Sequence, residues 1–274
     1  MIKAMGWMTI TLSVMGFSTN AFAKRYINAK NSEVNLRIGD YKQDALKTDL
    51  KVFVWNMYKG DKPDWKKEYK RLTKGMDILV LQELYIDQKM SEVFQEDENF
   101  AYDMATSFFD SKKGWIPSGV AIASDVQPLR SFWQRSHYRE PFIRTPKMVL
   151  FNEFAVEGSD QNLLVVTIHA INFVSSRKLR HQLRQVGNVV REHRGPVLFG
   201  GDFNTWSKKK ERYMRKEMAR AGLSEVALPG GRMRTFRHYL DYVFVKGLNV
   251  NYTKVHGGSD GSDHKAIELG VSVK

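Results

Sequence analysis

The chain has 274 residues, of which 42% are hydrophobic and 27% charged, an ordinary composition for one large α/β domain or two small ones. It contains no cysteine, which excludes a thiolate nucleophile, a cysteine-ligated metal centre, a disulfide scaffold and a lipid-modified N-terminal cysteine. With 43 Lys and Arg against 30 Asp and Glu, the net charge of +13 favours a polyanionic partner, namely nucleic acid, a phosphorylated ligand or an anionic membrane surface.

Residues 1–23 have the pattern of a secretory signal peptide. Lys3 supplies a positive charge, residues 4–17 are mostly apolar, and Ala21-Phe22-Ala23 is a small-x-small cleavage site. The apolar run is short for a hydrocarbon layer about 30 Å thick, so a cleaved signal is favoured over an uncleaved anchor. We therefore predict export, to the periplasm or out of the cell, after cleavage near Ala23. Residues 24–274 are predicted to form a single domain.

After a polar lead-in at residues 24–48, short apolar runs alternate with helix-like segments. The predicted strands are residues 52–56, 78–82, 119–124, 148–156, 163–169, 197–201, 239–246 and 266–273. The predicted helices are residues 63–74, 86–97, 177–193 and 207–221, the last two with apolar residues at three- and four-residue spacing. A Gly-Ser-Asp turn at residues 158–160 indicates a hairpin. The pattern predicts an α/β fold of two packed sheets, mixed or antiparallel, with helices outside.

Polar side chains lie within or just after these apolar runs, where packing does not require them. They are Asn56, Glu83, His169, Asp202 with Asn204, Asp241, and Asp263 with His264. Each alone has an ordinary explanation as a helix cap, a turn residue or a buried partner of a base. Six such positions together indicate a site, because ligands gather at strand ends in α/β folds.

The residue types suit one chemistry. Asn56, Glu83 and Asp263 offer the hard oxygen ligands that Mg²⁺ or Mn²⁺ prefers. His169 and His264 can transfer protons near neutral pH. A metal, a base and fixed amide donors are what an in-line displacement at phosphorus requires.

In this order the motifs resemble those of the endonuclease/exonuclease/phosphatase, or DNase I-like, superfamily, over roughly residues 50–273. The most specific motifs are Gly201-Asp202-Phe203-Asn204, Leu240-Asp241-Tyr242 and Ser262-Asp263-His264. Longer segments around residues 55–59, 168–173 and 201–207 are similar to an uncharacterised bacterial branch of it. The resemblance implies a four-layer sandwich, with two sheets flanked by helices, and a Mg²⁺-dependent hydrolase of phosphoric esters, with Mn²⁺ as an alternative metal.

The resemblance also implies roles for the metal ligands and the base. Glu83, with Asn56 alongside, holds the catalytic Mg²⁺, and Asp263 shares that metal or holds a second one. His264 activates the attacking water and is oriented by Asp241.

Further implied roles concern the substrate. Asp202 and Asn204 position the water and the scissile phosphate. His169 contacts a phosphate oxygen or protonates the leaving oxygen, and Asn172 binds substrate beside it. DNase I-type enzymes pair this histidine with a glutamate near the strand predicted at residues 119–124. Here residues 117–121 read Pro-Ser-Gly-Val-Ala and contain no acid, which leaves the role of His169 open.

The segment from residue 130 to 147 interleaves basic and aromatic side chains. Basic groups track a phosphate backbone and aromatic faces stack on unpaired bases, so Arg135, Arg139 and Arg144 are predicted substrate-binding residues. The same mixture suits an anionic membrane interface, and a solvated loop with its aromatics in the core is the structural alternative. The aromatic residues concerned are Phe132, Trp133, Tyr138 and Phe142.

Three functions follow. The first is an exported metal-dependent nuclease acting on DNA or RNA, with nucleic acid as its partner and no protein partner implied. The second is a phospholipid or sphingomyelin phosphodiesterase, or a phosphomonoesterase, acting on an anionic lipid or small phosphate ester. Residues 108–116 around Gly114 are a weak candidate for the apolar hairpin that a lipid enzyme would insert into a membrane. The third is a non-catalytic polyanion binder.

Overall fold

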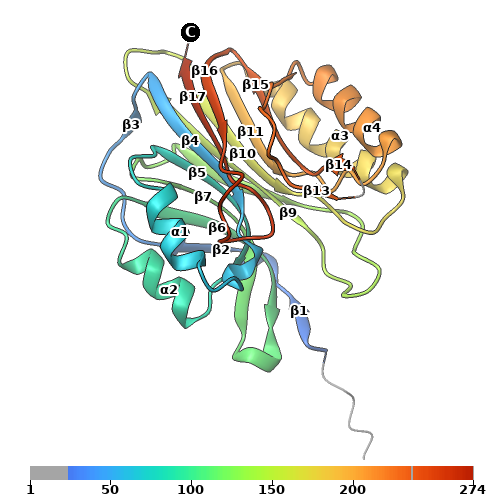
Figure 1. Ribbon diagram of the computed structural model, residues 1–274. Helices are drawn as coiled ribbons and strands as arrows, with labels where there is room; N and C mark the ends of the chain where they lie inside the picture. The colour runs from blue at the N-terminus through green and yellow to red at the C-terminus, as the bar shows by residue number, and fades with distance from the viewer. Residues whose placement is uncertain (1–23, 236, 274) are drawn as a thin grey trace, which may run out of the picture.

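The alternating apolar runs fold into two β-sheets that pack face to face, with helices over both outer faces (Figure 1). The computed structural model describes residues 24–235 and 237–273. The predicted signal peptide, residues 1–23, lies outside the described residues. In the described part no helix is long and apolar enough to cross a membrane.

The first sheet is mostly antiparallel, with one parallel pair at its centre. In spatial order its main path is β1 (Tyr26–Asn28), β6 (Ala101–Asp110), β7 (Ile116–Ser124), β5 (Ile78–Tyr85), β4 (Asp49–Asn56), β17 (Ile267–Val273) and β16 (Leu248–Val255). A further strand, β2 (Asn35–Ile38), also pairs with β6. Strands β4 and β5 are the parallel pair.

The second sheet is also mixed. In spatial order its main path is β12 (Ser224–Glu225), β15 (Asp241–Lys246), β11 (Val197–Asp202), β10 (Leu163–His169), β9 (Met148–Val156) and β3 (Ala45–Leu46). Strand β8 (Arg130–Arg135) pairs with β9. A separate two-stranded ribbon consists of β13 (Arg234–Thr235) and β14 (His238–Tyr239). Strands β10 and β11 are parallel, and β9 and β10 form the predicted antiparallel hairpin.

Helices α1 (Trp65–Leu72) and α2 (Gln88–Gln95) cover the first sheet, and α3 (Ser176–Glu192) and α4 (Lys208–Arg220) cover the second. Two of them have side-chain caps: Asp87 accepts a hydrogen bond from the backbone N–H of Met90 at the start of α2, and Ser207 accepts one from Lys210 at the start of α4. Short 3₁₀ turns follow β1, β4 and β6 at η1 (Asn31–Glu33), η2 (Tyr58–Gly60) and η3 (Ser111–Lys113).

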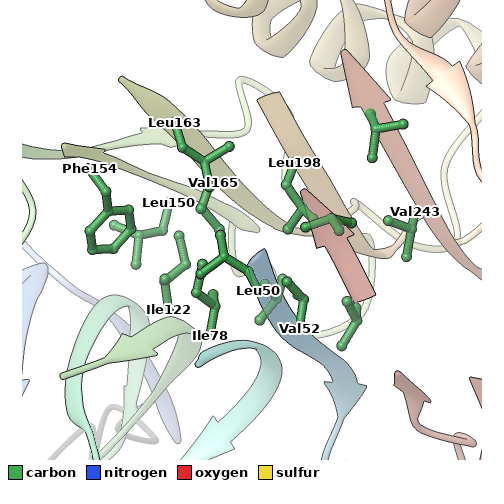
Figure 2. Packing of buried hydrophobic residues seen from close by; sticks show 14 of the residues in the cluster. Leu50, Val52, Ile78, Ile122, Leu150, Phe154, Leu163, Val165, Leu198 and Val243 are labelled. Atoms are coloured by element: carbon green, nitrogen blue, oxygen red, sulfur yellow. The ribbon is translucent and has the colours of Figure 1, made fainter. Parts of the chain in front are cut away.

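The central core lies between the two sheets (Figure 2). Because side chains alternate along a strand, every second residue of each central strand points into this layer. Val52, Ile78 and Ile122 of the first sheet meet Leu150 and Val165 of the second. The intervening residues face the helices, so the central strands are apolar on both faces and read as continuous hydrophobic runs.

The strand directions bring the polar strand ends together. Two of the parallel pairs, β4 with β5 and β10 with β11, each end at one edge of their sheet. Strands β15 and β17 run antiparallel to β11 and β4, so their first residues lie at those same edges. In register, Asp202 pairs with both His169 and Asp241. The four-layer fold therefore gathers side chains from six strands in one place.

The predicted four-layer α/β architecture is confirmed, and the predicted strands and helices lie within about two residues of the observed ones at most ends. No strand was predicted in the polar lead-in at residues 24–48, but it contains β1, β2 and β3. These short strands lie at sheet edges and are largely half-buried or exposed, so their sequence lacks an apolar run. Strands β6, β8 and β16 were also missed.

The N-terminal strand of the described chain is held by a buried carboxylate. Asp110 is 1% exposed and accepts hydrogen bonds from Arg25 at 2.7 and 3.0 Å and from the Tyr85 hydroxyl at 3.0 Å. The hydrogen bonds from Arg25 lower the pKa of Asp110 below its ordinary value of 3.8. The ionised pair therefore stabilises the fold above about pH 4, and this contribution is lost as the pH falls through the lowered pKa.

We expect Asp110→Asn to lower Tm by roughly 3–6 °C at pH 7, because it removes the charge that Arg25 and Tyr85 bond. The deficit relative to the parent protein should shrink as the pH is lowered from 5 towards 3. Thermal unfolding followed by circular dichroism at several pH values measures both effects. A deficit that stays constant over this range would show that the Asp110 charge does not stabilise the fold.

Candidate active site

The predicted site residues meet at the edge where β4, β5, β10 and β11 end and where β15 and β17 begin. Asn56 is the last residue of β4, His169 the last of β10 and Asp202 the last of β11. Asp241 is the first residue of β15. His264 precedes β17, and its loop is anchored to β4 because Ser262 donates a hydrogen bond to the Asn56 carbonyl at 2.7 Å.

Glu83 reaches the site through a distortion of its strand. The pairing of β5 with β7 shifts register between Leu81 and Leu84, and Glu83 between them has a left-handed backbone with φ of 54°. A bulge of this kind re-aims a side chain out of the regular alternation. Non-glycine residues with positive φ are uncommon and concentrate at functional sites. The bulge turns the Glu83 carboxylate towards Asn56, whose amide nitrogen donates to it at 3.2 Å.

The base predicted at His264 is paired as expected. Nδ1 of His264 lies 2.8 and 3.0 Å from the two carboxylate oxygens of Asp241. Because a carboxylate only accepts, Nδ1 carries the proton and the lone pair of Nε2 is directed to the site when the imidazole is neutral. Nε2 lies 3.9 Å from Oδ2 of Asp202. Both His264 and Asp241 are buried, at 7% and 4% exposed.

Asp202 occupies the centre of the cluster. Its Oδ1 accepts from the backbone N–H of Asn204 at 2.9 Å, and its Oδ2 accepts from the Asn56 amide at 3.2 Å. Burial raises the pKa of Asp202 to about 7, and the negative charges of Asp241 and Glu83 act in the same direction. The residue before Asp202 must be glycine, because β10 and β11 are in close contact there: a Cβ on Gly201 would lie 2.2 Å from the Ile168 carbonyl oxygen.

Glu83, His169 and Asp202 form a set that could hold a metal ion, with one ligand atom from each within 4.8 Å of the others. Nε2 of His169 lies 3.7 Å from both Glu83 Oε1 and Asp202 Oδ2. Of the predicted ligands, Glu83 is in this set and Asn56 bridges its two carboxylates. Asp263 is half-buried near them, and burial, together with the charge of Glu83, raises its pKa.

The charge balance of the site fits a divalent cation. Glu83, Asp202, Asp241 and Asp263 place four carboxyl groups around two imidazoles. Although burial alone would lower it, the charges of Asp241, Asp202 and Asp263 raise the pKa of His264 to about 10. A histidine held in this protonated state cannot accept a proton at pH 7. A cation bound to the carboxylates would offset their negative charge. The pKa of His264 would then fall, and its neutral imidazole could act as a base.

The side chain beside Nδ1 of His169 is a lysine. Nδ1 of His169 lies 3.5 Å from Nζ of Lys147, and Lys147 lies 3.5 Å from the carboxylate of Glu140. Burial lowers the pKa of His169 well below its ordinary value, and the Lys147 charge adds to this, so the imidazole is neutral at pH 7. An ammonium only donates, which makes Nδ1 the acceptor and places the ring proton on Nε2, facing Glu83 and Asp202.

Lys147 also affects Glu83. Burial alone would raise the pKa of this carboxyl, but positive charges from His169, Lys147 and Lys59 lower it to about 2. Sequence reasoning missed Lys147, Glu140 and Lys59. The first two lie in or after the loop that follows β8, and no strand-end pattern marked them.

Two predicted asparagines have mainly local partners. The Asn204 amide donates to the Ala170 carbonyl at 2.8 Å and accepts from Trp206 Nε1 at 3.0 Å, so it ties the loops after β10 and β11 together. The Asn172 side chain accepts from the backbone N–H of Phe173 at 2.7 Å. Direct contacts of either asparagine with substrate stay predictions.

The basic and aromatic segment separates into two parts. The Arg135 guanidinium bonds the Ala29 carbonyl at 2.8 Å and Asn31 at 3.1 Å, which fixes it to the lead-in rather than to a surface. Arg139 and Arg144 are exposed. Three of the four aromatic residues pack against hydrophobic core clusters, whereas Phe142 is 81% exposed. The packed residues are Phe132, Trp133 and Tyr138.

A pocket of about 200 Å³ opens beside Glu83 and His169, and Lys59, Glu140, Lys147 and Asn172 line it. A larger cavity, of about 630 Å³, lies at the other end of β10 and β11 beside Asn162 and His193. We place chemistry beside the smaller pocket, because Glu83 and His169 of the strand-end cluster line it.

The fold and this cluster define a hydrolase of the DNase I-like class. Residues 53–264 match the Endonuclease/Exonuclease/phosphatase family, and the chain belongs to that family of phosphoric ester hydrolases. A UPF0294 protein of Vibrio campbellii is 30% identical over 243 residues, covering 86% of this chain and 83% of that protein.

Solved structures share the fold. An endonuclease/exonuclease/phosphatase from Beutenbergia cavernae has a TM-score of 0.66 at 17% identity, covering 82% of this chain and 72% of that one. TDP2 of D. rerio, solved with a single-strand DNA product, has a TM-score of 0.59 at 17% identity and covers 82% of this chain and 100% of that one.

Proposed function

We propose that this protein is an exported, divalent-metal-dependent phosphodiesterase that hydrolyses nucleic acid. The observation that carries the proposal is the buried Asp241–His264 pair aimed at a cluster of carboxylates. Such a pair is the arrangement by which a general base is oriented, and the carboxylates suit the metal that phosphoryl chemistry uses.

In this mechanism the lone pair on Nε2 of His264 accepts a proton from water, and Asp241 stabilises the imidazolium that forms. The water oxygen bonds to phosphorus as the bond from phosphorus to the leaving oxygen breaks, and the leaving oxygen takes a proton from solvent water. Asp202 lies 3.9 Å from His264 and is placed to orient the water. His169 donates from Nε2 to a phosphate oxygen, a role that its neutral state permits. Because burial and the charge of Lys147 keep His169 neutral, we prefer hydrogen bonding over delivery of a proton by His169.

Glu83 and Asp202 would hold the metal, and Asp263, whose charge interacts with Glu83, would share it or hold a second one. When bound, the metal would neutralise charge that develops on the phosphate oxygens. Mg²⁺ fits these oxygen ligands, and Mn²⁺ accepts the same ligands. Lys59 and Lys147, which line the pocket, supply further positive charge to the substrate phosphate.

Three observations support nucleic acid as substrate. The net charge of +13 favours an extended polyanion. Arg139 and Arg144 are exposed in the loop from which Glu140, Ile143 and Lys147 line the pocket. TDP2 of D. rerio, which shares the fold, was solved with single-strand DNA.

The lipid alternative has one supporting feature. The hairpin of β6 and β7 extends beyond the first sheet (Figure 1), and Trp115 at its turn is 58% exposed. Phe108 on the same hairpin is buried at 6%. A single exposed aromatic gives little apolar area for insertion into a membrane.

A substrate panel tests the proposal. Purified protein with Mg²⁺ or Mn²⁺ should cleave plasmid DNA, single-stranded DNA or RNA, and EDTA should stop the reaction. Sphingomyelin and phosphatidylglycerol vesicles, assayed in parallel for release of headgroup, cover the lipid alternative. Cleavage of lipid without cleavage of nucleic acid would overturn the choice of substrate. Export is tested by fractionating producing cells and sequencing the N-terminus of the mature protein, which we expect near Lys24.

The two exposed arginines give a quantitative prediction. For single-stranded DNA, replacing Arg139 and Arg144 by glutamine should lower the slope of log Kd against log salt concentration by about 1.4, since two phosphate contacts are lost. Fluorescence anisotropy in EDTA at several salt concentrations measures the slope. Replacing Arg191 and Arg194, exposed at the far end of α3, is the matched control and should leave it unchanged. An unchanged slope in the Arg139/Arg144 variant would place that loop outside the contact surface.

A further inference from the structure

Three aromatic side chains form a ridge beside the pocket. The Phe142 and Phe173 ring centroids are 5.8 Å apart, and those of Phe173 and Trp206 are 6.0 Å apart with planes inclined by 27°. Phe142 is 81% exposed and Phe173 is 63% exposed. The three residues come from separate loops, which follow β8, β10 and β11. We call this set the aromatic ridge.

Large exposed aromatic side chains lose apolar contact with the protein, so a cluster of them indicates a binding surface. The backbone holds this one in place. Phe173 has a left-handed backbone with φ of 52°, and its N–H donates to the Asn172 side chain at 2.7 Å. The local geometry turns the Phe173 ring outward at the cost of an uncommon conformation.

The ridge is joined to the chemistry at two points. Phe173 lines the same pocket as Glu83 and His169. Trp206 donates from Nε1 to Asn204, whose backbone N–H bonds the central carboxylate of Asp202. A group resting on the ridge is therefore next to the group whose phosphate occupies the pocket.

The surroundings of the ridge are basic. Each aromatic residue is followed within a few positions by exposed cations, namely Arg144 after Phe142, Arg177 and Lys178 after Phe173, and Lys208 and Lys209 after Trp206. A flat apolar face among such cations complements a chain of phosphates that carries flat bases. A lipid acyl chain would bind an apolar surface that is distant from charged groups. The aromatic ridge lies next to the buried carboxylates, so it suits a base better than an acyl chain.

We propose that the aromatic ridge stacks an unpaired base of the nucleic-acid strand next to the scissile phosphate, so that the enzyme prefers single-stranded or frayed substrate. This proposal rests on the proposed function and specifies its substrate. Base stacking contributes roughly 1–3 kcal/mol per base in such proteins, which corresponds to about a 5- to 140-fold change in affinity.

Two probes of equal charge test the stacking. One is a fluorescent ten-residue oligothymidylate, and the other has the same backbone with abasic tetrahydrofuran units in place of its bases. Binding is measured by anisotropy in EDTA, where no hydrolysis is expected. We expect the parent protein to bind the oligothymidylate at least tenfold more tightly. Equal binding of the two probes would overturn the proposal.

Variants then assign the preference to the ridge. Phe142→Ala with Phe173→Ala should reduce it to twofold or less, and Phe142→Tyr with Phe173→Tyr should restore it. Leu129→Ala removes a side chain that is 61% exposed near the opposite end of the sheet, and it should have no effect. A preference that survives the double alanine change would overturn the proposal.

Vesicles of phosphatidylglycerol and phosphatidylcholine complete the test. If the double alanine variant loses vesicle binding while keeping the base preference, the ridge contacts lipid and the proposal is wrong. Hydrolysis is scored separately on plasmid DNA. Hydrolysis without a base preference would contradict the stacking proposal alone. A base preference without hydrolysis would contradict the proposed function but not the stacking of a base on the ridge.

Discussion

Replacing His264 by alanine is expected to lower kcat for phosphodiester hydrolysis by at least about 100-fold, because a positioned general base contributes 10²–10⁴-fold. Nδ1 of His264 is fixed by Asp241 at 2.8 Å, so Nε2 faces the site with a defined lone pair. The loss should fall on kcat more than on KM, since the imidazole takes its proton only as the water attacks. Steady-state hydrolysis of an oligonucleotide measures both constants.

The control for this variant is another histidine paired with a carboxylate. Nε2 of His256 lies 2.9 Å from Glu268 on the first sheet, outside the cluster described above. His256→Ala should therefore keep near-normal turnover, with Tm reported for both variants to separate catalysis from folding. Near-normal turnover of folded His264→Ala would rule out His264 as the base.

Replacing Glu83 by glutamine should produce the second large loss. The substitution keeps the shape and removes the charge that we assign to the metal. Since loss of groups that merely support a metal ligand costs 10–100-fold in metal affinity, we expect at least a 100-fold rise in the Mg²⁺ concentration needed for half-maximal activity. The Mg²⁺ titration should be accompanied by a thermal-shift titration, which reports metal binding without turnover.

The matched control is Glu98→Gln, which removes an exposed carboxylate in the turn between α2 and β6. It should leave both titrations unchanged. In Glu83→Gln the rise in Tm on adding Mn²⁺ should disappear at concentrations that stabilise the parent protein. An unchanged thermal shift together with an unchanged Mg²⁺ requirement would remove Glu83 from the metal site.

The site residues that could be predicted from the sequence are the polar ones that follow an apolar run. Asn56, His169 and Asp202 end strands that are buried on both faces, so their apolar runs were easy to locate. Parallel pairing then forces such ends to one edge, and antiparallel partners bring Asp241 and His264 to it. Strand directions in such sheets follow a few general rules, so the clustering of these site residues could be predicted from the sequence.

Other parts depend on contacts that local sequence does not encode. Strand β6 is an interior strand that buries Asp103, Thr106 and Ser107. These polar residues interrupt its apolar run, so the sequence did not predict it as a strand. Strand β16 is largely exposed and has no apolar run, because it lies at the edge of the first sheet. The lead-in strands pair with β6 and β9, which are far from them in sequence.

The functional residues that were missed lie on loops. Lys147 reaches His169 only because the segment after β8 folds back over the pocket, and no spacing rule connects the two. The aromatic ridge joins three loops for the same reason. Within the segment from residue 130 to 147, sequence could not separate Arg135, which bonds the lead-in, from the exposed Arg144.

The most direct test of the central claim is nicking of supercoiled plasmid by the purified protein with Mg²⁺, compared with His264→Ala and with EDTA. The site described here predicts conversion of the supercoiled form to the relaxed and linear forms by the parent protein alone. It also predicts that the variant and the EDTA reaction show at most about one hundredth of that rate. Nicking at the parent rate by folded His264→Ala, or in the presence of EDTA, would contradict the claim that this metal-and-histidine site cleaves phosphodiesters.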